Sequence, residues 1–357
     1  MNLSPTETLI SFPGLGIKPF VVDAVAFELF GREIRWYAII ITLGIVCCLT
    51  YLILQARKIG VTMDDIIDGA LFVIPIGIIG ARLYYVIFDQ EHTYDSLLEV
   101  IDMTNGGLAI YGGIIAGTLT VLVYSMVKRI NFLALGDCIA PGVLLAQGIG
   151  RWGNFMNGEA FGYETDWFCR MGLKNNITYT TFGTTEMCFV HPTFLYESLW
   201  NLLGVLLVYL FQKFVGKKYD GQLVYLTFGW YGFGRMFIEA LRTDSLGDKE
   251  NNVRVSLILG AVIFVVCLFL LIFFAIKKPN TGYYFKYPVA EGTKLPKISF
   301  KERLIGTFYT RRTEENEKPI DYKPILAAEK ARLAAEKQAK LDAKKNKENK
   351  ENKENKE

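Results

Sequence analysis

Seven long apolar segments constrain the fold of this chain more than any other feature of its sequence. A helix that crosses the hydrocarbon core of a bilayer needs about 20 predominantly apolar residues, and each segment approaches that length. The segments are Trp36–Gln55, Ile66–Phe88, Leu108–Val127, Ala134–Gly150, Thr193–Phe211, Leu223–Leu241 and Val255–Ile276. Hydrophobic residues make up 51% of the chain and fall in blocks instead of periodic stripes, which disfavours a soluble fold. The sequence predicts an all-α polytopic membrane protein with seven transmembrane helices.

Basic residues lie in alternate connections between these segments. They follow the first, third, fifth and seventh segments, at Arg57, Lys58, Lys128, Arg129, Lys213, Lys217, Lys218, Lys277 and Lys278. Residues 89–107, which follow the second segment, contain no lysine or arginine. Because cytoplasmic loops are enriched in these residues, we predict a multi-pass protein whose N-terminus is outside and whose C-terminus is cytoplasmic.

The segments divide the chain into three regions. We expect an arm along the outer surface (residues 1–35), a membrane body (residues 36–280) and a cytoplasmic tail (residues 281–357). The body includes a long connection, residues 151–192, whose length is typical of a functional loop and whose Ile177–Phe182 portion predicts a small extramembrane β-hairpin. The net charge is +3 for the whole chain and +8 for residues 277–357. A charged, repetitive tail of this kind is expected to be largely disordered and does not indicate nucleic-acid binding.

The six cysteines do not form a metal-binding pattern. No two of them are spaced as Cys-x-x-Cys, and the chain has only two histidines. We therefore expect no metal and no other cofactor. Cys169 and Cys188 lie in the same outward connection, where a disulfide is compatible with an oxidising compartment.

A polar cluster directly follows the fourth apolar segment. Residues 148–159 read Gly-Ile-Gly-Arg-Trp-Gly-Asn-Phe-Met-Asn-Gly-Glu. An arginine at the bilayer midplane costs about 2.5–3.5 kcal/mol on insertion scales, so charged groups persist in membrane segments where they face a protein-lined cavity. Arg151 is followed by the neutral donors Asn154 and Asn157 and by Glu159, and the glycines let the backbone come close to a ligand. We interpret this cluster as an anion site at a membrane surface.

A second polar set lies on the sixth apolar segment. Tyr231, Arg235, Glu239 and Arg242 are spaced so that they share one helix face, which must point into the bundle or into a wet crevice. Taken alone, an ion pair between Arg235 and Glu239 with a purely structural role explains this face. Arg151 and Arg235 together would instead suit a phosphate.

Four further residues have roles that the sequence leaves open. Glu197, near the start of the fifth segment, is compatible with orienting an arginine, with acting as a base, or with a structural role. Tyr111 and Tyr37 begin the third and first segments, where each is an interfacial aromatic or a pocket hydroxyl. Arg82 either reaches the interface or pairs with a carboxylate such as Asp89.

Together these residues resemble the motifs of the prolipoprotein diacylglyceryl transferase family, bacterial enzymes that attach lipid to lipoprotein precursors. Residues 150–159 resemble the signature of that family, and residues 191–197 and 231–242 are similar to its later blocks in the same order. Trp36-Tyr37 and Gly80-Ala81-Arg82 match weaker blocks. The resemblance covers about residues 20–280 and implies a seven-span body with an outward head domain in the bacterial plasma membrane.

The resemblance also implies a reaction, the first step of lipoprotein maturation. The diacylglyceryl group of phosphatidylglycerol moves to the thiol of the lipobox cysteine in a prolipoprotein signal peptide, and glycerol phosphate is released. Arg151 and Arg235 would clamp the phosphate as its negative charge grows. Asn154 and Asn157 would hold the glycerol headgroup or the remaining phosphate oxygens.

The implied proton acceptor is not fixed by the sequence. Glu159, Glu197 and Glu239 would either orient the arginines or accept the thiol proton. Tyr37, Tyr231 and Arg242 complete the expected substrate site. Family members often carry a histidine where this chain has Tyr111, so Tyr111 supplies a hydroxyl or proton removal lies elsewhere.

Two other functions are alternatives to this one. A membrane transporter or a binding protein for an anionic lipid or solute would also need converging arginines, but the chain shows no similarity between its halves. Another phospholipid-headgroup transferase would need a cluster of metal-binding aspartates, and the sequence has none.

Overall fold

The computed structural model describes residues 3–59, 61–89, 94, 96–101, 107–128, 130–244, 247–248, 253–277, 338 and 342. The chain divides into two compact units, Met1–Arg311 and Arg312–Glu357. The second is described only at Gln338 and Asp342, which are helical and joined by a hydrogen bond of 3.1 Å. The predicted disorder of the rest of residues 281–357 therefore lies outside the described residues.

The described part of the first unit is mostly helical. Its α-helices are α1 (Trp36–Ala56), α2 (Met63–Phe88), α3 (Leu97–Ile101), α4 (Ile110–Lys128), α5 (Phe132–Asn157), α6 (Asn176–Phe182), α7 (Thr193–Phe214), α8 (Gln222–Ala240) and α9 (Val255–Lys277). The strands are β1 (Glu7–Phe12), β2 (Ile17–Asp23), β3 (Val25–Leu29), β4 (Arg32–Arg35), β5 (Met171–Lys174), β6 (Cys188–Val190), β7 (Gly247–Asp248) and β8 (Val253–Arg254). Short 3₁₀ turns lie at η1 (Pro13–Leu15) and η2 (Arg57–Ile59).

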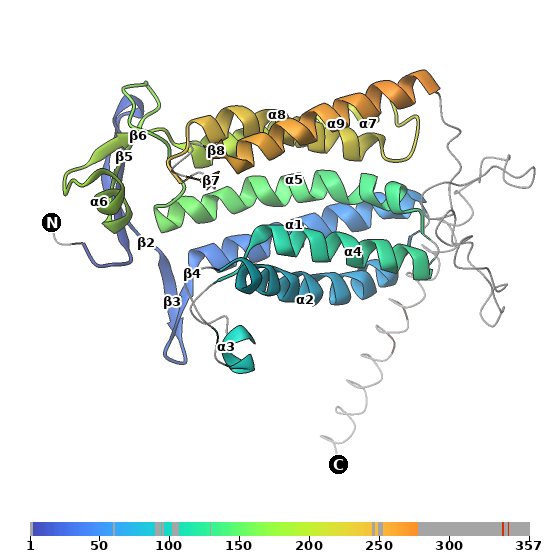
Figure 1. Ribbon diagram of the computed structural model, residues 1–357, viewed down its shortest axis with the longest axis horizontal. Helices are drawn as coiled ribbons and strands as arrows, with labels where there is room; N and C mark the ends of the chain where they lie inside the picture. The colour runs from blue at the N-terminus through green and yellow to red at the C-terminus, as the bar shows by residue number, and fades with distance from the viewer. Residues whose placement is uncertain are drawn as a thin grey trace, which may run out of the picture. The chain divides into compact units, whose positions relative to one another are not determined.

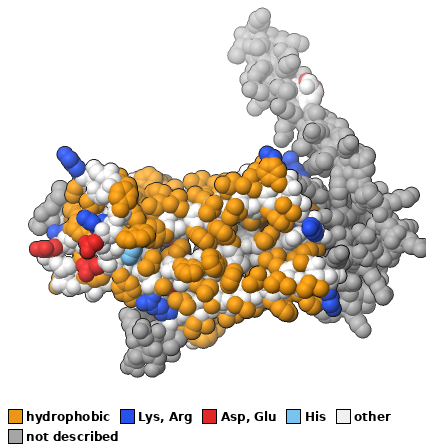
Figure 2. Space-filling view, turned by 90° about the horizontal axis from the view of Figure 1, so that it is seen from above, with side chains coloured by type: hydrophobic (Ala, Val, Ile, Leu, Met, Phe, Trp, Pro, Cys, Tyr) orange, Lys and Arg blue, Asp and Glu red, His pale blue; other side chains and the backbone are white. Residues whose placement is uncertain are grey.

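Among the described residues, six helices are long and apolar enough to cross a membrane: α1, α2, α4, α5, α7 and α9. The sixth predicted segment is also helical, as α8, but it is not among these six. Its Gln222, Arg235 and Glu239 lower its hydropathy. Figure 2 shows hydrophobic side chains covering the helical body and charged side chains gathering at its two ends. The chain is thus a polytopic, mainly helical membrane protein.

Helix α5 forms the centre of the bundle. It packs against α1, α7 and α8, while α2 pairs with α4 and α8 pairs with α9 (Figure 1). Asn131 caps the start of α5, because its side chain accepts a hydrogen bond from the Ala134 N–H at 3.0 Å. The helix then continues past the predicted end of the fourth segment at Gly150 to Asn157. The polar cluster therefore lies on the last turns of a buried helix.

A four-stranded antiparallel sheet lies at one end of the bundle, in the order β2-β1-β5-β6 (Figure 1). We call this the sheet end, and the opposite end, where α1, α4 and α9 finish, the basic end. Strand β1 pairs with β5, for example Ile10 with Leu173, so the first strands and the 151–192 connection share one core. The prediction of an all-α fold is wrong for these strands, because the sheet depends on the pairing of β1 with β5, which lie far apart in the sequence.

The β-hairpin predicted at Ile177–Phe182 is wrong, since these residues belong to the helix α6. Asn175 caps that helix by accepting from the Thr178 N–H at 2.9 Å, while the Thr178 hydroxyl lies 3.0 Å from the Asn175 N–H. This reciprocal capping stabilises the first turn of a helix. It outweighs the strand preference of the β-branched residues that follow.

Candidate active site

Arg151 lies on α5, six residues before the helix ends at Asn157, at the sheet end. The helix stops because Gly158 adopts a left-handed conformation (φ 61°) and its N–H donates to the carbonyls of Asn154 and Phe155. That turn brings Glu159 back beside the last helical turn. A methyl group at Gly153 would lie 2.8 Å from the Tyr37 ring, so glycine allows α1 to place Tyr37 against α5.

The segment after α5 joins the start of α7 to the end of α8. The Thr193 hydroxyl donates to the Ala160 carbonyl, and the Gly162 N–H donates to the His191 carbonyl at 3.0 Å. The Tyr163 N–H donates to the Leu241 carbonyl at 2.9 Å. These bonds hold α7 and α8 beside the Arg151 turn.

Three arginines from separate places in the chain converge on the Glu197 carboxylate. Arg151 Nη2 lies 2.5 Å from Glu197 Oε2, whereas Arg235 Nη1 and Arg242 Nη1 lie 3.0 and 3.2 Å from Oε1. Glu197 is 4% exposed, so this carboxylate is shared in a site with little water. We call Glu197 and these three arginines the Arg151–Glu197 cluster.

Two more carboxylates balance the charge of this cluster. Arg235 Nη2 lies 2.6 Å from Glu239 Oε2, and Arg242 Nη2 lies 2.8 Å from Asp244 Oδ2. Burial lowers the pKa of Arg242, but its bonds to Asp244 and the charges of Asp244, Glu197 and Glu239 raise it above its usual value overall. Three guanidinium groups thus face three carboxylates. The predicted Arg235–Glu239 ion pair is confirmed, and the sequence interpretation missed Asp244.

The asparagines and Glu159 form a second, adjoining network. Asn154 Nδ2 and Asn157 Nδ2 donate to Glu159 Oε1 at 2.9 and 3.1 Å, and Arg151 Nη1 donates to Asn154 Oδ1 at 3.3 Å. In the described part of the chain, Asn157 Oδ1 is buried and has no hydrogen-bond partner. A buried acceptor of this kind is costly unless a ligand or water donates to it.

Two of the three predicted tyrosines lie at this site. Tyr37 is within electrostatic range of Arg151 and Glu159, and Tyr231 is within range of Arg151. Tyr111 makes other contacts: its hydroxyl lies 3.3 Å from Ser256 Oγ, and its ring faces Tyr84. Among the described residues, no hydrogen bond joins Tyr111 to the Arg151–Glu197 cluster.

The Arg82 side chain does not reach the membrane interface as an unpaired charge. Its guanidinium is buried and donates to the carbonyls of Glu99, Val100 and Gly107 at 2.8, 2.8 and 3.1 Å. These bonds hold α3 and the residues before α4. Arg82 therefore has at least a structural role in the connection between α2 and α4.

A chain of hydrogen-bonding side chains at the start of α7 was not anticipated from the sequence. His191 Nδ1 lies 3.3 Å from the Tyr196 hydroxyl, which lies 3.2 Å from Cys169 Sγ. Burial lowers the pKa of His191, which favours the neutral imidazole. Cys169 and Cys188 are both free, so the disulfide that the sequence allowed is not formed.

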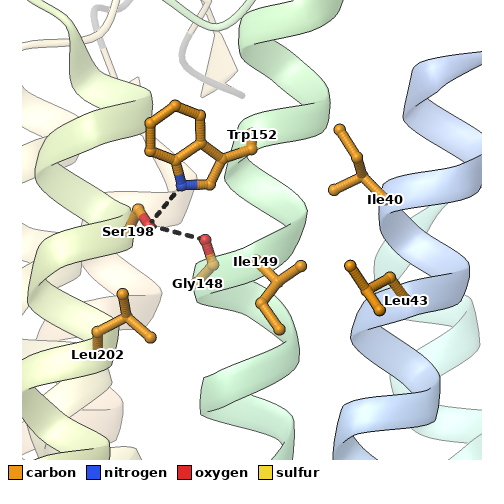
Figure 3. Close-up of a pocket in the computed structure, with 7 residues that line it drawn as sticks. All are labelled: Ile40, Leu43, Gly148, Ile149, Trp152, Ser198 and Leu202. Atoms are coloured by element: carbon orange, nitrogen blue, oxygen red, sulfur yellow. Dashed lines mark hydrogen bonds between the residues drawn. The ribbon is translucent and has the colours of Figure 1, made fainter.

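An apolar pocket of about 250 Å³ lies beside the cluster, between α1, α5 and α7 (Figure 3). Its lining residues are Ile40, Leu43, Gly148, Ile149, Trp152, Ser198 and Leu202. The Trp152 indole N–H donates to Ser198 Oγ at 3.2 Å, and the Ser198 hydroxyl donates to the Gly148 carbonyl at 2.9 Å. These bonds pair the polar groups of Trp152 and Ser198 with protein atoms, so the pocket offers a ligand mainly apolar surface. Trp152, which lines the pocket, directly follows Arg151 in the sequence.

The described part of the chain contains no group of three or more His, Cys, Asp or Glu that could hold a metal ion. The chemistry that this site can offer with its own side chains is therefore anion binding by arginines, proton transfer by carboxylates and apolar binding in the adjoining pocket.

The amino-acid sequence is similar to those of known proteins. A family model described as prolipoprotein diacylglyceryl transferase matches residues 24–273. The chain is 40% identical over 271 residues to the phosphatidylglycerol–prolipoprotein diacylglyceryl transferase of Listeria welshimeri, which covers 76% of this chain and 95% of that protein. It is 42% identical over 254 residues to the protein of that name from Clostridioides difficile, covering 69% of this chain and 96% of the relative. For the Enterococcus faecalis protein the identity is 41% over 267 residues, covering 74% and 94%.

Proposed function

The chain belongs to the prolipoprotein diacylglyceryl transferase family, and we propose that the Arg151–Glu197 cluster is where it performs the family's reaction. The protein is a transferase that moves a diacylglyceryl group from phosphatidylglycerol to prolipoproteins. The acceptor is the thiol of the lipobox cysteine in the signal peptide. The observation that carries the assignment of the site is the convergence of three arginines on Glu197.

Helix α8 is the seventh crossing of the membrane. At its start, the N–H groups of Leu223 and Val224 donate to Asp137, near the beginning of α5, at 2.8 and 2.9 Å. Just past its end, Arg242 contacts Glu197, which lies beside the last turns of α5. A helix tied to both ends of a membrane helix spans the same thickness. Seven crossings, with Arg57, Lys128, Lys217 and Lys277 at the basic end, put the sheet end and its head domain outside and the C-terminus in the cytoplasm.

Phosphatidylglycerol binds with its phosphate on Arg151 and Arg235. Both guanidinium groups already carry a carboxylate, and a phosphate oxygen takes the place of a Glu197 oxygen because bidentate contacts to phosphate suit arginine. The unpartnered Oδ1 of Asn157 accepts a hydrogen bond from a hydroxyl of the glycerol headgroup. One acyl chain lies in the apolar pocket that Trp152 lines (Figure 3).

The chemical step is a displacement at the glyceryl carbon. The cysteine sulfur forms a bond to that carbon, the carbon–oxygen bond to the phosphate breaks, and glycerol phosphate leaves with the bonding electrons. The negative charge of the leaving phosphate grows during this step. Arg151 and Arg235 stabilise it in a site that is shielded from water, where such interactions are strong.

The thiol proton goes to Glu159. A cysteine thiol has an unperturbed pKa of about 8.5, so a base is needed near neutral pH. Glu197 and Glu239 are bound to arginines, whereas in the described structure the Glu159 carboxylate meets the neutral amides of Asn154 and Asn157. Glu159 is therefore the carboxylate best placed to take a proton. Tyr111 has no part in this transfer.

The test is thioether formation by the purified protein with phosphatidylglycerol and a lipobox peptide. The peptide should gain the mass of one diacylglyceryl group. Arg151→Lys should lower kcat/KM by about 10³, because lysine cannot replace a bidentate guanidinium at a developing charge. Arg170→Lys is the matched control, because the Arg170 guanidinium donates to the Asp166 carbonyl and lies over the Phe189 ring, outside the Arg151–Glu197 cluster. Normal turnover by Arg151→Lys, or flux of an anionic solute without any mass gain, would reject the proposal.

A further inference from the structure

The hairpin of β3 and β4 carries an exposed aromatic residue at its tip. Phe30 is 96% exposed, the highest value among the large hydrophobic residues that the structure describes. Phe30 and Gly31 form the two-residue turn with φ of 51° and 74°. Turns with two positive φ values strongly favour Asn, Asp and Gly, and a bulky residue there is strained. The turn itself therefore does not explain the choice of phenylalanine.

The two faces of this hairpin differ in character. Phe27 lies opposite Ile34 and Leu29 lies opposite Arg32, whereas Glu28 lies opposite Glu33. Because side chains alternate along a strand, Phe27, Leu29 and Ile34 share one face and the two glutamates share the other. Phe27 and Leu29 are each about half exposed, at 50% and 49%. The hairpin thus has one uncovered face that is apolar apart from Arg32. Its other face carries Glu28 and Glu33, with Arg35 3.5 Å from Glu33, and we call it the acidic face.

The base of the hairpin lies where the membrane begins. Strand β4 ends at Arg35 and α1 begins at Trp36, whose N–H donates to the Ala24 carbonyl at 3.0 Å. Half-exposed Trp36 and Tyr37 are aromatic residues of the kind that mark a membrane–water interface. Figure 1 shows the hairpin extending across the direction of the helices and away from the four-stranded sheet. This direction lies along the membrane surface.

We propose that the β3–β4 hairpin rests on the lipid surface at the sheet end, with Phe27, Leu29 and Phe30 in the interfacial layer. The occupant of its apolar face is lipid, because β4 runs directly into α1, a helix that is long and apolar enough to cross the membrane and that exposes apolar side chains such as Leu43 and Val46. Arg32, exposed beside Leu29, suits the phosphate of an anionic headgroup. Glu28 and Glu33 point to water. The proposal requires only that α1 crosses the membrane and does not rest on the proposed chemistry.

Photocrosslinking in vesicles tests the orientation directly. The full chain with Phe30→p-benzoylphenylalanine is reconstituted into vesicles of phosphatidylcholine and phosphatidylglycerol, illuminated and digested, and the hairpin peptide is weighed. We expect a lipid adduct at position 30. Glu28→p-benzoylphenylalanine, on the acidic face, is the matched control and should give a several-fold lower yield. No adduct at position 30, or equal yields at both positions, overturns the proposal.

A second variant separates anchoring from turn formation. Phe30→Asn installs a residue that the turn prefers, so the protein should fold at least as well as the parent. With the anchor gone, the apparent KM for phosphatidylglycerol in vesicles should rise about threefold at unchanged kcat. Phe168→Asn, at another exposed phenylalanine, should leave KM unchanged. An unchanged KM for Phe30→Asn would contradict the anchor. A chain without transferase activity would still give the lipid adduct, so the two proposals fail separately.

Discussion

Buried charged side chains gather near both ends of α5, and the two clusters are built differently. At the basic end, the Asp137 carboxylate accepts from the N–H groups of Gly221, Leu223 and Val224 at 2.8, 2.8 and 2.9 Å. Lys217 Nζ lies 3.0 Å from the same carboxylate. All these partners belong to the short stretch that leads into α8. Asp137 therefore fastens one helix start to α5.

At the sheet end, the Glu197 carboxylate is shared by side chains from distant parts of the chain. Its three arginines come from α5, from α8 and from the residues after α8. The backbone N–H groups bonded to Asp137 are fixed in direction by the first turn of α8, whereas a guanidinium can exchange one oxygen ligand for another. Buried charge alone therefore does not identify an active site. We propose that buried charges able to change partners beside a pocket are the ones that mark the candidate site.

Among the variants that compare the two clusters, Glu197→Gln should have the largest effect. The three arginines lose a shared anion, so the orientation of Arg151 and Arg235 toward the phosphate is lost. We expect kcat/KM for thioether formation to fall by about 10²–10³, with some loss of stability because positive charge is left buried. Peptide mass measured below the melting temperature reports the activity. Glu164→Gln, at an exposed carboxylate of the head region, is the control. Full activity of Glu197→Gln would show that the arginines position themselves without it.

Asp137→Asn should lower the stability of the protein and leave its activity nearly unchanged, the reverse of Glu197→Gln. Loss of the charge weakens four bonds at the start of α8, and we expect about 2–3 kcal/mol of destabilisation, seen as a lower melting temperature in detergent. Activity per folded molecule should stay within about twofold, because the site is at the far end of α5. An Asp137→Asn protein with normal stability and little activity would remove the distinction between the two clusters.

The parts of the candidate site that could be predicted are those whose residues are close together in the sequence. Arg151, Asn154 and Asn157 lie on the last turns of one helix and Glu159 follows two residues after it, so their proximity could be anticipated. The Arg235–Glu239 pair follows from helical spacing. The central position of Glu197 could not be derived, because it depends on how α7 packs between α5 and α8.

The strands were also hard to predict where they depend on contacts between distant parts of the chain. The pairing of Ile10 with Leu173 joins residues far apart in the chain, and no local pattern announces it. Conversely, the β-branched residues around Ile177 favoured a hairpin, but capping by Asn175 and Thr178 made a helix. The apolar segments were predictable because each one satisfies its own backbone hydrogen bonds.

A smaller effect should appear in the pH dependence of stability at the sheet end. Burial lowers the pKa of His191 relative to the unfolded chain. The unfolded state then binds more protons below a pH of about 6.5, so the free energy of unfolding falls as the pH is lowered through that value. His191→Gln should flatten this acid-side fall in melting temperature. An acid limb that is unchanged in His191→Gln would assign the effect to other groups.

The smallest effect should come from Tyr111→Phe, and it shows how far the sheet-end site extends. The Tyr111 hydroxyl lies 3.3 Å from Ser256 Oγ, which joins the start of α4 to the start of α9, and the structure describes no bond from it to the Arg151–Glu197 cluster. Removing the hydroxyl costs one neutral hydrogen bond, about 1 kcal/mol of stability. We expect kcat/KM to stay within about twofold and its pH profile to keep its shape. A large fall in kcat with a shifted profile would place Tyr111 in the proton transfer after all, and would enlarge the site from α5, α7 and α8 to include α4. Ser256→Ala distinguishes the two cases, because it removes the same hydrogen bond while leaving the tyrosine hydroxyl free to act.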